Sequence, residues 1–501
     1  MNNTFSYLAS GFANLLNVAT LLLVLMGVCV GILGGAIPGI SPSMAVALLL
    51  PMTYKMEPTQ AIIMLMGIYI GANYGGSITA VSINTPGTPS AAVTAFDGYP
   101  LAKAGRAGEA MGLSLWASTF GGLLGTIVLI FFSIPLARVA IKFWPSEYFA
   151  LCLMGLTTVA TLGGKHWQKA LSMVLFGLLI NTIGNDPMFG ITRFTWGNVA
   201  LYDGIPMVPI LIGLFALGEV FYNLEHYNPQ ETKFQKIDYN LPKMSYYWKL
   251  KWSILRSGLI GCVIGVFPGA GGTIASFIAY DIEKRFSKTP EEFGHGAPAG
   301  VVAAEASNSG SVGGAMVPLL ALGIPGSSTA AVLIGALMIH NLTPGPELFT
   351  NNPTLVYTLF ASMFVAHVIM AAVGVLGCKL WVRVTAIPKT ILYPLIFAFS
   401  ILGSYAVEKN IVHVVFCLIF GLLGWMMKKY KYPAAPVVLG VVLGKLMETN
   451  FSQIPVVGKG SWADLYTRPL TIILFIISIA AIAYPLLQEK RAKKKAAKLQ
   501  E

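Results

Sequence analysis

The feature that most constrains this chain is a proline–glycine break that interrupts apolar, glycine-rich sequence in both halves. The first copy is Pro38-Gly39 and the second is Pro268-Gly269, 230 residues later. Another pair of breaks, Pro86-Gly87 and Pro325-Gly326, lies 239 residues apart. Proline removes a backbone donor and glycine loosens a helix, so each break frees peptide groups within apolar sequence. Such breaks at matching positions of two halves predict the binding site of a transporter.

The composition of the chain is that of a membrane protein. Hydrophobic residues make up 55% of its 501 residues and charged residues only 11%, and the mean hydropathy is +0.70. Apolar runs at 115–134, 170–183, 356–375 and 470–487 have about the length that crosses a bilayer as a helix. They predict an all-α polytopic membrane protein with roughly 10–12 membrane segments, several of them interrupted. The five cysteines lack metal-ligand spacing, so no metal site is expected.

The net charge of +12 is concentrated next to apolar runs. Basic residues gather in the mid-chain segment 233–256 and in the tail at 490–498. Clusters in such places are typical of cytoplasmic loops, where anionic lipid headgroups are the natural partner. We therefore expect the lipid bilayer, and no nucleic acid, as the partner of these charges.

The repeat predicts how the chain is divided. The expected parts are a first transmembrane repeat at 12–227, a cytoplasmic linker at 228–251, a second transmembrane repeat at 252–450, an outer loop and final transmembrane helix at 451–488, and a basic cytoplasmic tail at 489–501. The loop after the second break carries Lys103 and Arg106 in the first copy, whereas its counterpart, 340–353, has no lysine or arginine. Corresponding loops are thus expected on opposite faces, which predicts two inverted structural repeats.

The stretch around Pro268-Gly269 has basic residues on both flanks, at 249–256 and 284–288. If both flanks are cytoplasmic, the stretch enters the membrane and returns as a re-entrant hairpin. The alternative is one membrane-spanning helix with a kink at the break.

Small polar residues surround all four breaks. A helix that restarts after a break points its free N–H groups and the positive end of its dipole at the bend, which suits a carboxylate without a buried cation. The predicted substrate-binding residues are Gly39, Ser41, Asn84, Thr85, Gly87, Thr88 and Ser90 in the first copy, and Gly269, Thr273, Asn308, Gly326, Ser327 and Ser328 in the second. The alternative is that these small residues serve close helix packing.

Few ionisable residues lie within apolar sequence. Asn73 and Glu305 are candidates for binding a coupling cation, Na⁺ or H⁺; Glu305 is alternatively an interfacial residue paired with a neighbour. Glu219 is matched in the second copy by Lys445, and both are expected at helix ends with structural roles. Asp97, beside the basic loop, is expected to be solvated.

Several motifs resemble one family. The chain is similar, over about residues 15–450, to the large permease subunit (TctA) of tripartite tricarboxylate transporters, through the runs 31–39, 71–79, 84–90, 267–272 and 323–327. The resemblance implies a bacterial inner-membrane permease that imports carboxylates with the energy of an ion gradient. It also implies two partners, a small TctB-like membrane subunit and a periplasmic TctC-like substrate-binding protein.

The expected function follows from the breaks and the resemblance together. It is that of the large transmembrane permease subunit of a tripartite, binding-protein-dependent uptake system for tricarboxylates or dicarboxylates such as citrate. The chain lacks GxSxG, HExxH and Walker lysine motifs, so it is not expected to be an enzyme or to need a cofactor beyond the coupling cation. The alternatives are a membrane-embedded enzyme acting on lipid-linked substrates and a passive anion channel.

Overall fold

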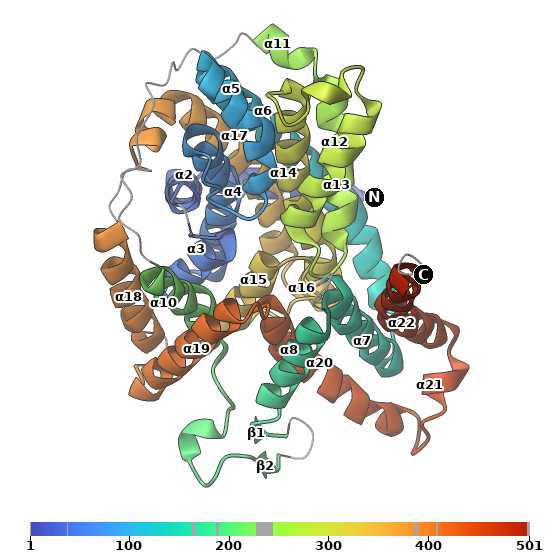
Figure 1. The fold of residues 1–501 in the computed structure, drawn as a ribbon. Helices are drawn as coiled ribbons and strands as arrows, with labels where there is room; N and C mark the ends of the chain where they lie inside the picture. Colours follow the sequence, from blue (N-terminus) through green and yellow to red (C-terminus); the bar gives the residue numbers. More distant parts are fainter. Residues whose placement is uncertain are drawn as a thin grey trace.

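A computed structural model describes residues 2–37, 39–162, 167–186, 190–226, 244–384, 389–406 and 409–497. Pro38, the linker up to residue 243 and the last four residues of the tail lie outside the described residues. The described chain is almost entirely helical, as Figure 1 shows. Within it, six helices are long and apolar enough to cross a membrane, and four shorter apolar helices accompany them. These findings confirm the prediction of an all-α polytopic membrane protein.

The first half holds helices α1 to α10 and two short strands. Its helices are α1 (Asn2–Leu15), α2 (Val18–Gly35), α3 (Pro42–Leu49), α4 (Pro58–Ile83), α5 (Ala91–Leu101), α6 (Ala107–Ala140), α7 (Pro145–Leu162), α8 (Trp167–Asn181), α9 (Met207–Leu211) and α10 (Gly218–Glu225). The 3₁₀ turns η1 (Leu50–Thr53) and η4 (Val199–Leu201) and the π-helical turns η2 (Ala102–Arg106) and η5 (Ile212–Leu217) join or extend them. Strands β1 (Gly184–Asn185) and β2 (Thr192–Arg193) pair antiparallel.

The second half is helical throughout its described residues. It consists of α11 (Met244–Trp248), α12 (Lys251–Val266), α13 (Gly271–Phe286), the 3₁₀ turn η6 (Pro290–Glu292), α14 (Pro298–Leu322), α15 (Ser328–Ile339), α16 (Pro346–Asn351), α17 (Pro353–Val384), α18 (Lys389–Ala406), α19 (Ile411–Lys429), α20 (Ala435–Val457), α21 (Asp464–Thr467) and α22 (Pro469–Ala497). Helix α20 thus continues past residue 450, where the second repeat was expected to end; the repeat boundaries stay predictions.

Helices α4 and α14 form the buried centre of the molecule. Each begins with proline at its first position, where the missing N–H is not needed. Each ends at a residue in the left-handed region, Asn84 (φ 53°) after α4 and Gly323 (φ 74°) after α14. These two caps are 239 residues apart, the same spacing as the second pair of breaks. The left-handed conformation explains why asparagine stands at position 84, since asparagine tolerates this region better than most residues.

Glycines allow α2 to cross α4, and α12 to cross α14, at backbone contact. A Cβ on Gly35 would collide with the backbone of Ala72, and one on Gly265 would collide with the backbone of Ser311. Gly265 lies 230 residues after Gly35, and Ser311 lies 239 residues after Ala72, so the contact joins equivalent residues in the two halves. The two halves therefore contain the same packing unit. The inverted relation between the copies stays a prediction.

The stretch around Pro268-Gly269 is a hairpin of two helices. Helix α12 ends at Val266, α13 begins at Gly271, and the two pack side by side (Figure 1). Arg256 of α12 bonds Glu283 of α13 at 2.6 Å (Nη2 to Oε2), several turns from the break. The chain therefore reverses direction here instead of continuing as one kinked helix. Its re-entry into a membrane stays a prediction.

The two halves interleave rather than forming separate lobes. Helix α6 of the first half packs along α14 of the second, and α17 packs against α4. Helix α20 lies against α7 and α8, and α19 lies against η5 and α10. Because each half covers helices of the other, the broken segments of both come together in the interior.

The glycine crossings predict that alanine substitution at two adjacent residues of α2 has very different effects on stability. Gly35→Ala places a methyl group on the Ala72 backbone, and overpacking of this kind costs about 1–3 kcal/mol. Gly34→Ala meets only side-chain atoms, the nearest being the Ala45 Cβ at 3.3 Å. We expect Gly35→Ala to lower the melting temperature of the purified protein in detergent by several degrees, and Gly34→Ala to change it little. Equal melting temperatures for the two variants would contradict the crossing geometry.

Candidate functional site

Four helices begin around one cavity of about 240 Å³ between the two halves. They are α3, α5, α13 and α15, each of which follows one of the four breaks. The lining consists of Ser41, Pro42, Ser43, Tyr69, Asn73, Thr88, Pro89, Ser90, residues 269–274, Asn308, Ser327, Ser328, Thr329 and Ala435. None of these residues is ionisable to a charged form at neutral pH. The positive ends of four helix dipoles therefore give the cavity its electrostatic character.

Serine hydroxyls cap two of these helices. Ser41 accepts a hydrogen bond from Met44 N at 3.2 Å at the start of α3, and its Oγ lies 3.0 Å from Ser43 Oγ. Ser327 accepts from Ala330 N at 3.1 Å at the start of α15. Each cap satisfies one of the free N–H groups that the first turn of a helix leaves.

The other two helices begin with tighter backbone geometry. Before α5, Thr88 Oγ1 accepts from Ala91 N at 3.4 Å and lies 3.1 Å from Ser90 Oγ. Before α13, Gly269 (φ 78°) and Gly271 (φ 55°) adopt left-handed conformations that favour glycine. The backbone is thus exposed to the cavity at α13 without intervening side chains.

Asn308 and Tyr69 face the cavity from the two central helices. They lie 239 residues apart and so occupy equivalent positions on α14 and α4. Asn308 is 1% exposed, and neither its Oδ1 nor its Nδ2 has a hydrogen-bond partner among the described residues. Tyr69 Oη instead lies 3.0 Å from Ser327 Oγ. A buried amide without partners is costly, so Asn308 is a donor and acceptor that a ligand in the cavity would satisfy.

The structure brings most of the predicted site residues to this cavity. Those on its lining are Ser41, Thr88, Ser90, Gly269, Thr273, Asn308, Ser327 and Ser328, together with the ion-site candidate Asn73. Those that do not line it are Gly39, Asn84, Thr85, Gly87, Gly326 and Glu305. Whether the residues of either set bind substrate stays a prediction.

Gly87 and Gly326, which do not line the cavity, have packing roles in this conformation. A Cβ on Gly87 would collide with the Gly35 carbonyl oxygen, and one on Gly326 would collide with that of Gly265, so both glycines let a break lie directly on a neighbouring helix. Asn84 and Thr85 are exposed at the end of α4. Tyr69 is one of the lining residues that the sequence interpretation missed; the 239-residue spacing from Asn308 would have indicated it.

Glu305 is buried one helical turn before Asn308 but turns away from the cavity. Its two carboxylate oxygens accept hydrogen bonds from Thr94 Oγ1 of α5 and, at 2.8 Å, from Ser118 Oγ of α6. The side chain is fully buried. This carboxylate therefore joins α14 to two helices of the first half, and its role in ion coupling stays a prediction.

Asp97 and Lys445 differ from the sequence interpretation. Asp97 is not solvated: its Oδ1 accepts from the backbone N–H groups of Gly294, Gly296 and Ala297, at 2.7, 2.9 and 2.9 Å, and it is completely buried. It thereby fixes α5 to the loop that precedes α14. Glu219, in the first turn of α10, forms an ion pair with Lys428, whereas Lys445 lies in the middle of α20 and not at a helix end as expected.

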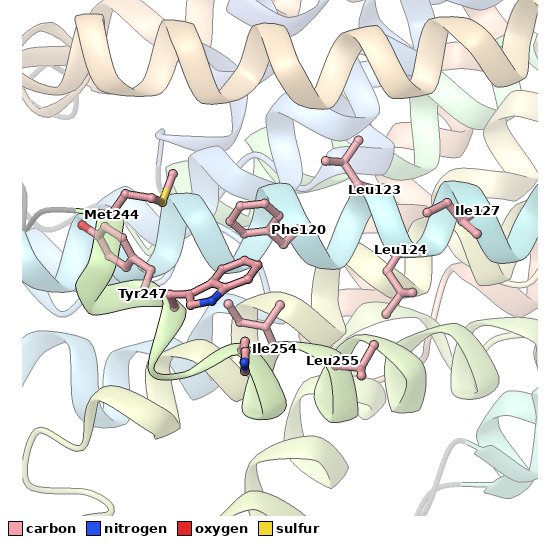
Figure 2. A pocket seen from close by; sticks show the side chains of 10 residues that line it. Phe120, Leu123, Leu124, Ile127, Met244, Tyr247, Ile254 and Leu255 are labelled. Atoms are coloured by element: carbon pink, nitrogen blue, oxygen red, sulfur yellow. The ribbon is translucent and has the colours of Figure 1, made fainter.

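A separate groove of about 370 Å³ lies between α6, α11 and α12. Figure 2 shows that Phe120 and Leu124 of α6 lie opposite Ile254 and Leu255 of α12, and Lys251 is its one charged lining residue. Its lining is almost entirely hydrocarbon, which suits an acyl chain or an apolar helix. A carboxylate would lose most of its hydration against this apolar lining, so the groove suits a polar ligand less well than the cavity between the four helix starts.

Comparisons with known proteins agree with the geometry. The model of a family described as the Tripartite tricarboxylate transporter TctA family matches residues 21–439. An uncharacterized 52.8 kDa protein in the TAR-I ttuC' 3' region of Agrobacterium vitis is 36% identical over 494 residues, which are 99% of this chain and 98% of that protein. An uncharacterized protein in the TAR-II ttuC' 3' region of the same organism is 33% identical over 234 residues, 47% of this chain and 97% of its own length.

The predicted coupling role of Glu305 is testable with one substitution. Glu305→Gln keeps the size of the side chain, but its amide neither takes up a proton nor balances a cation. If Glu305 carries the coupling ion, the variant is expected to exchange carboxylate across proteoliposomes at equilibrium and to lose most gradient-driven accumulation. Accumulation at the wild-type level, with a lowered melting temperature, would show that the carboxylate only joins the helices.

Proposed function

This chain belongs to the tripartite tricarboxylate transporter TctA family, and we propose that it is the large permease subunit of an ion-gradient-driven uptake system for di- or tricarboxylates. It is a multi-pass membrane protein and a transporter component, not an enzyme. The bacterial inner membrane is consistent with the family and with the apolar helices. The substrate, the coupling and the partners belong to the proposal.

The observation that carries the proposal is the chemistry of the cavity. Four helix N-termini meet around it, and the side chain of Asn308, buried beside them, has no hydrogen-bond partner among the described residues. Backbone N–H groups at a helix start, with the positive dipole end behind them, bind anions well. Hydroxyls of Ser327 and Ser328 lie at the same place. A carboxylate accepts from donors of this kind, and no buried lysine or arginine is left unbalanced when the cavity is empty.

The arrangement also fits a transport cycle. Each half contributes two of the four helix starts, so movement of one half against the other would divide the cavity between them. Bound carboxylate would contact both halves, whereas a coupling cation, Na⁺ or H⁺, would offset its charge. Asn73, whose Nδ2 donates to Tyr69 O at 3.2 Å, lines the cavity and is the candidate to face such a cation.

The tripartite character of the family supports two protein partners. We expect a small TctB-like membrane subunit beside the permease and a periplasmic TctC-like binding protein that delivers the carboxylate. The loop at 340–353 has no lysine or arginine, and we expect it on the outer face, opposite its basic counterpart; it is a candidate for receiving that protein.

The function is tested by uptake into proteoliposomes. Radiolabelled citrate, succinate and malate would be offered under imposed Na⁺ or H⁺ gradients, with and without the membrane subunit and the binding protein. We expect accumulation above the external concentration under at least one gradient. Downhill equilibration alone would favour a channel, and the complete assembly taking up none of these carboxylates would contradict the proposal.

Within that assay, Asn308→Ala and Asn84→Gly distinguish a ligand contact from a helix cap. A lost hydrogen bond to a charged group costs about 1.5–3 kcal/mol, so Asn308→Ala is expected to raise KM at least roughly tenfold. Asn84→Gly keeps the left-handed conformation at φ 53° and is expected to leave KM unchanged. An unchanged KM in Asn308→Ala would remove Asn308 from the site.

A further inference from the structure

A second pocket, of about 200 Å³, adjoins the cavity. Ser41 lines both spaces, and Ala434 of the second pocket directly precedes Ala435 of the first. The rest of the lining comes mainly from η5, α10 and α19, and its charged residues are Glu219 and Lys428. The chemistry of this pocket therefore bears on what enters or leaves the cavity.

Glu219 and Lys428 form an ion pair within the second pocket. The Lys428 ammonium donates to Glu219 Oε1, which also accepts from Asn223 Nδ2 at 3.0 Å. The ammonium lies 4.5 Å from the centre of the Tyr222 ring. The side chain of Lys428 is 37% exposed and that of Glu219 is 22% exposed. An anion in the pocket can therefore reach the pair.

The ion pair and the cavity share one short loop. A Cβ on Gly39 (φ 97°) would lie 3.2 Å from Asn223 Nδ2 and 3.7 Å from Glu219 Oε1. Two residues later, Ser41 lines the cavity and caps α3. The loop after the first break therefore touches the ion pair at one residue and the proposed substrate site at another.

Glu219 presents to Lys428 the same chemical group that the proposed substrate carries. The cavity offers dipoles and hydroxyls but no cation, whereas the adjoining pocket holds an ammonium. A partly exposed ion pair adds little to stability, so another carboxylate can replace Glu219 there at little cost. We infer that Lys428 is a second, transient binding station for a substrate carboxylate, occupied by Glu219 when substrate is absent. This inference rests on the proposed carboxylate function.

Substitutions of Lys428 and of Glu219 are expected to change uptake kinetics in different ways. Lys428→Gln leaves the Glu219 carboxylate without its cation beside the cavity, where it repels substrate, so KM for citrate is expected to rise roughly tenfold. Glu219→Gln frees the ammonium to hold substrate longer, so KM and the maximal rate are both expected to fall, by roughly fivefold. The shift in KM should be larger for citrate than for succinate, because citrate carries more charge.

The neighbouring ion pair supplies a matched control. Lys429 follows Lys428 on α19 and bonds Glu225 of α10 at 2.5 Å (Nζ to Oε1). This pair also joins α10 to α19, but neither residue lines the pocket. Lys429→Gln and Glu225→Gln should therefore leave KM unchanged, and melting temperatures of all four variants would report any shared structural role.

The outcomes of these experiments distinguish failure of the inferred binding station at Lys428 from failure of the proposed function. If the wild-type assembly takes up none of the carboxylates offered, the proposed function fails and the station fails with it. If the wild type is active but Lys428→Gln and Glu219→Gln change KM no more than their controls do, only the station is overturned. Opposite shifts of KM in Lys428→Gln and Glu219→Gln, with the control pair unaffected, are the result we expect.

Discussion

The structure depends on four helix starts that the breaks place in its interior, where backbone N–H groups need partners. Apolar surroundings cannot satisfy such groups, so the breaks must be covered by protein or face a polar ligand. Here the starts of α3, α5, α13 and α15 meet around one cavity. Hydroxyls of Ser41 and Ser327 satisfy one donor each, and backbone carbonyl oxygens satisfy the first turn of α5. Close glycine crossings, such as Gly35 on Ala72, hold α2 near enough to α4 for the breaks to meet. Packing and binding chemistry thus come from the same repeated unit.

The sequence predicted the features that recur in both halves. The spacings of 230 and 239 residues indicated the paired breaks, and eight of the thirteen predicted substrate-binding residues line one cavity. The same spacings explain residues that were predicted but lie elsewhere. Asn84 and Gly323 are equivalent left-handed caps, and Gly87 and Gly326 are equivalent points of helix contact. Small residues beside a break serve either binding or packing, and composition alone does not separate the two.

Contacts between distant segments could not be predicted. Asp97 resembled a solvated loop residue, yet its three backbone donors lie about 200 residues away, from Gly294 to Ala297. Glu219 and Lys445 were matched as equivalent positions of the repeat, but the interleaving of the halves gives Glu219 a different partner, Lys428. The repeat predicts equivalence between residues, and equivalence is not contact. Pairing across the two halves is a property of the assembled fold.

The central claim is that the cavity between the four helix starts binds a carboxylate. An experimental density map of the permease in saturating citrate would test it most directly. We predict density within the cavity, with carboxylate oxygens at hydrogen-bond distance from the Asn308 amide and from first-turn N–H groups of α13 or α15. A cavity without density, together with citrate bound elsewhere on the protein, would contradict the account.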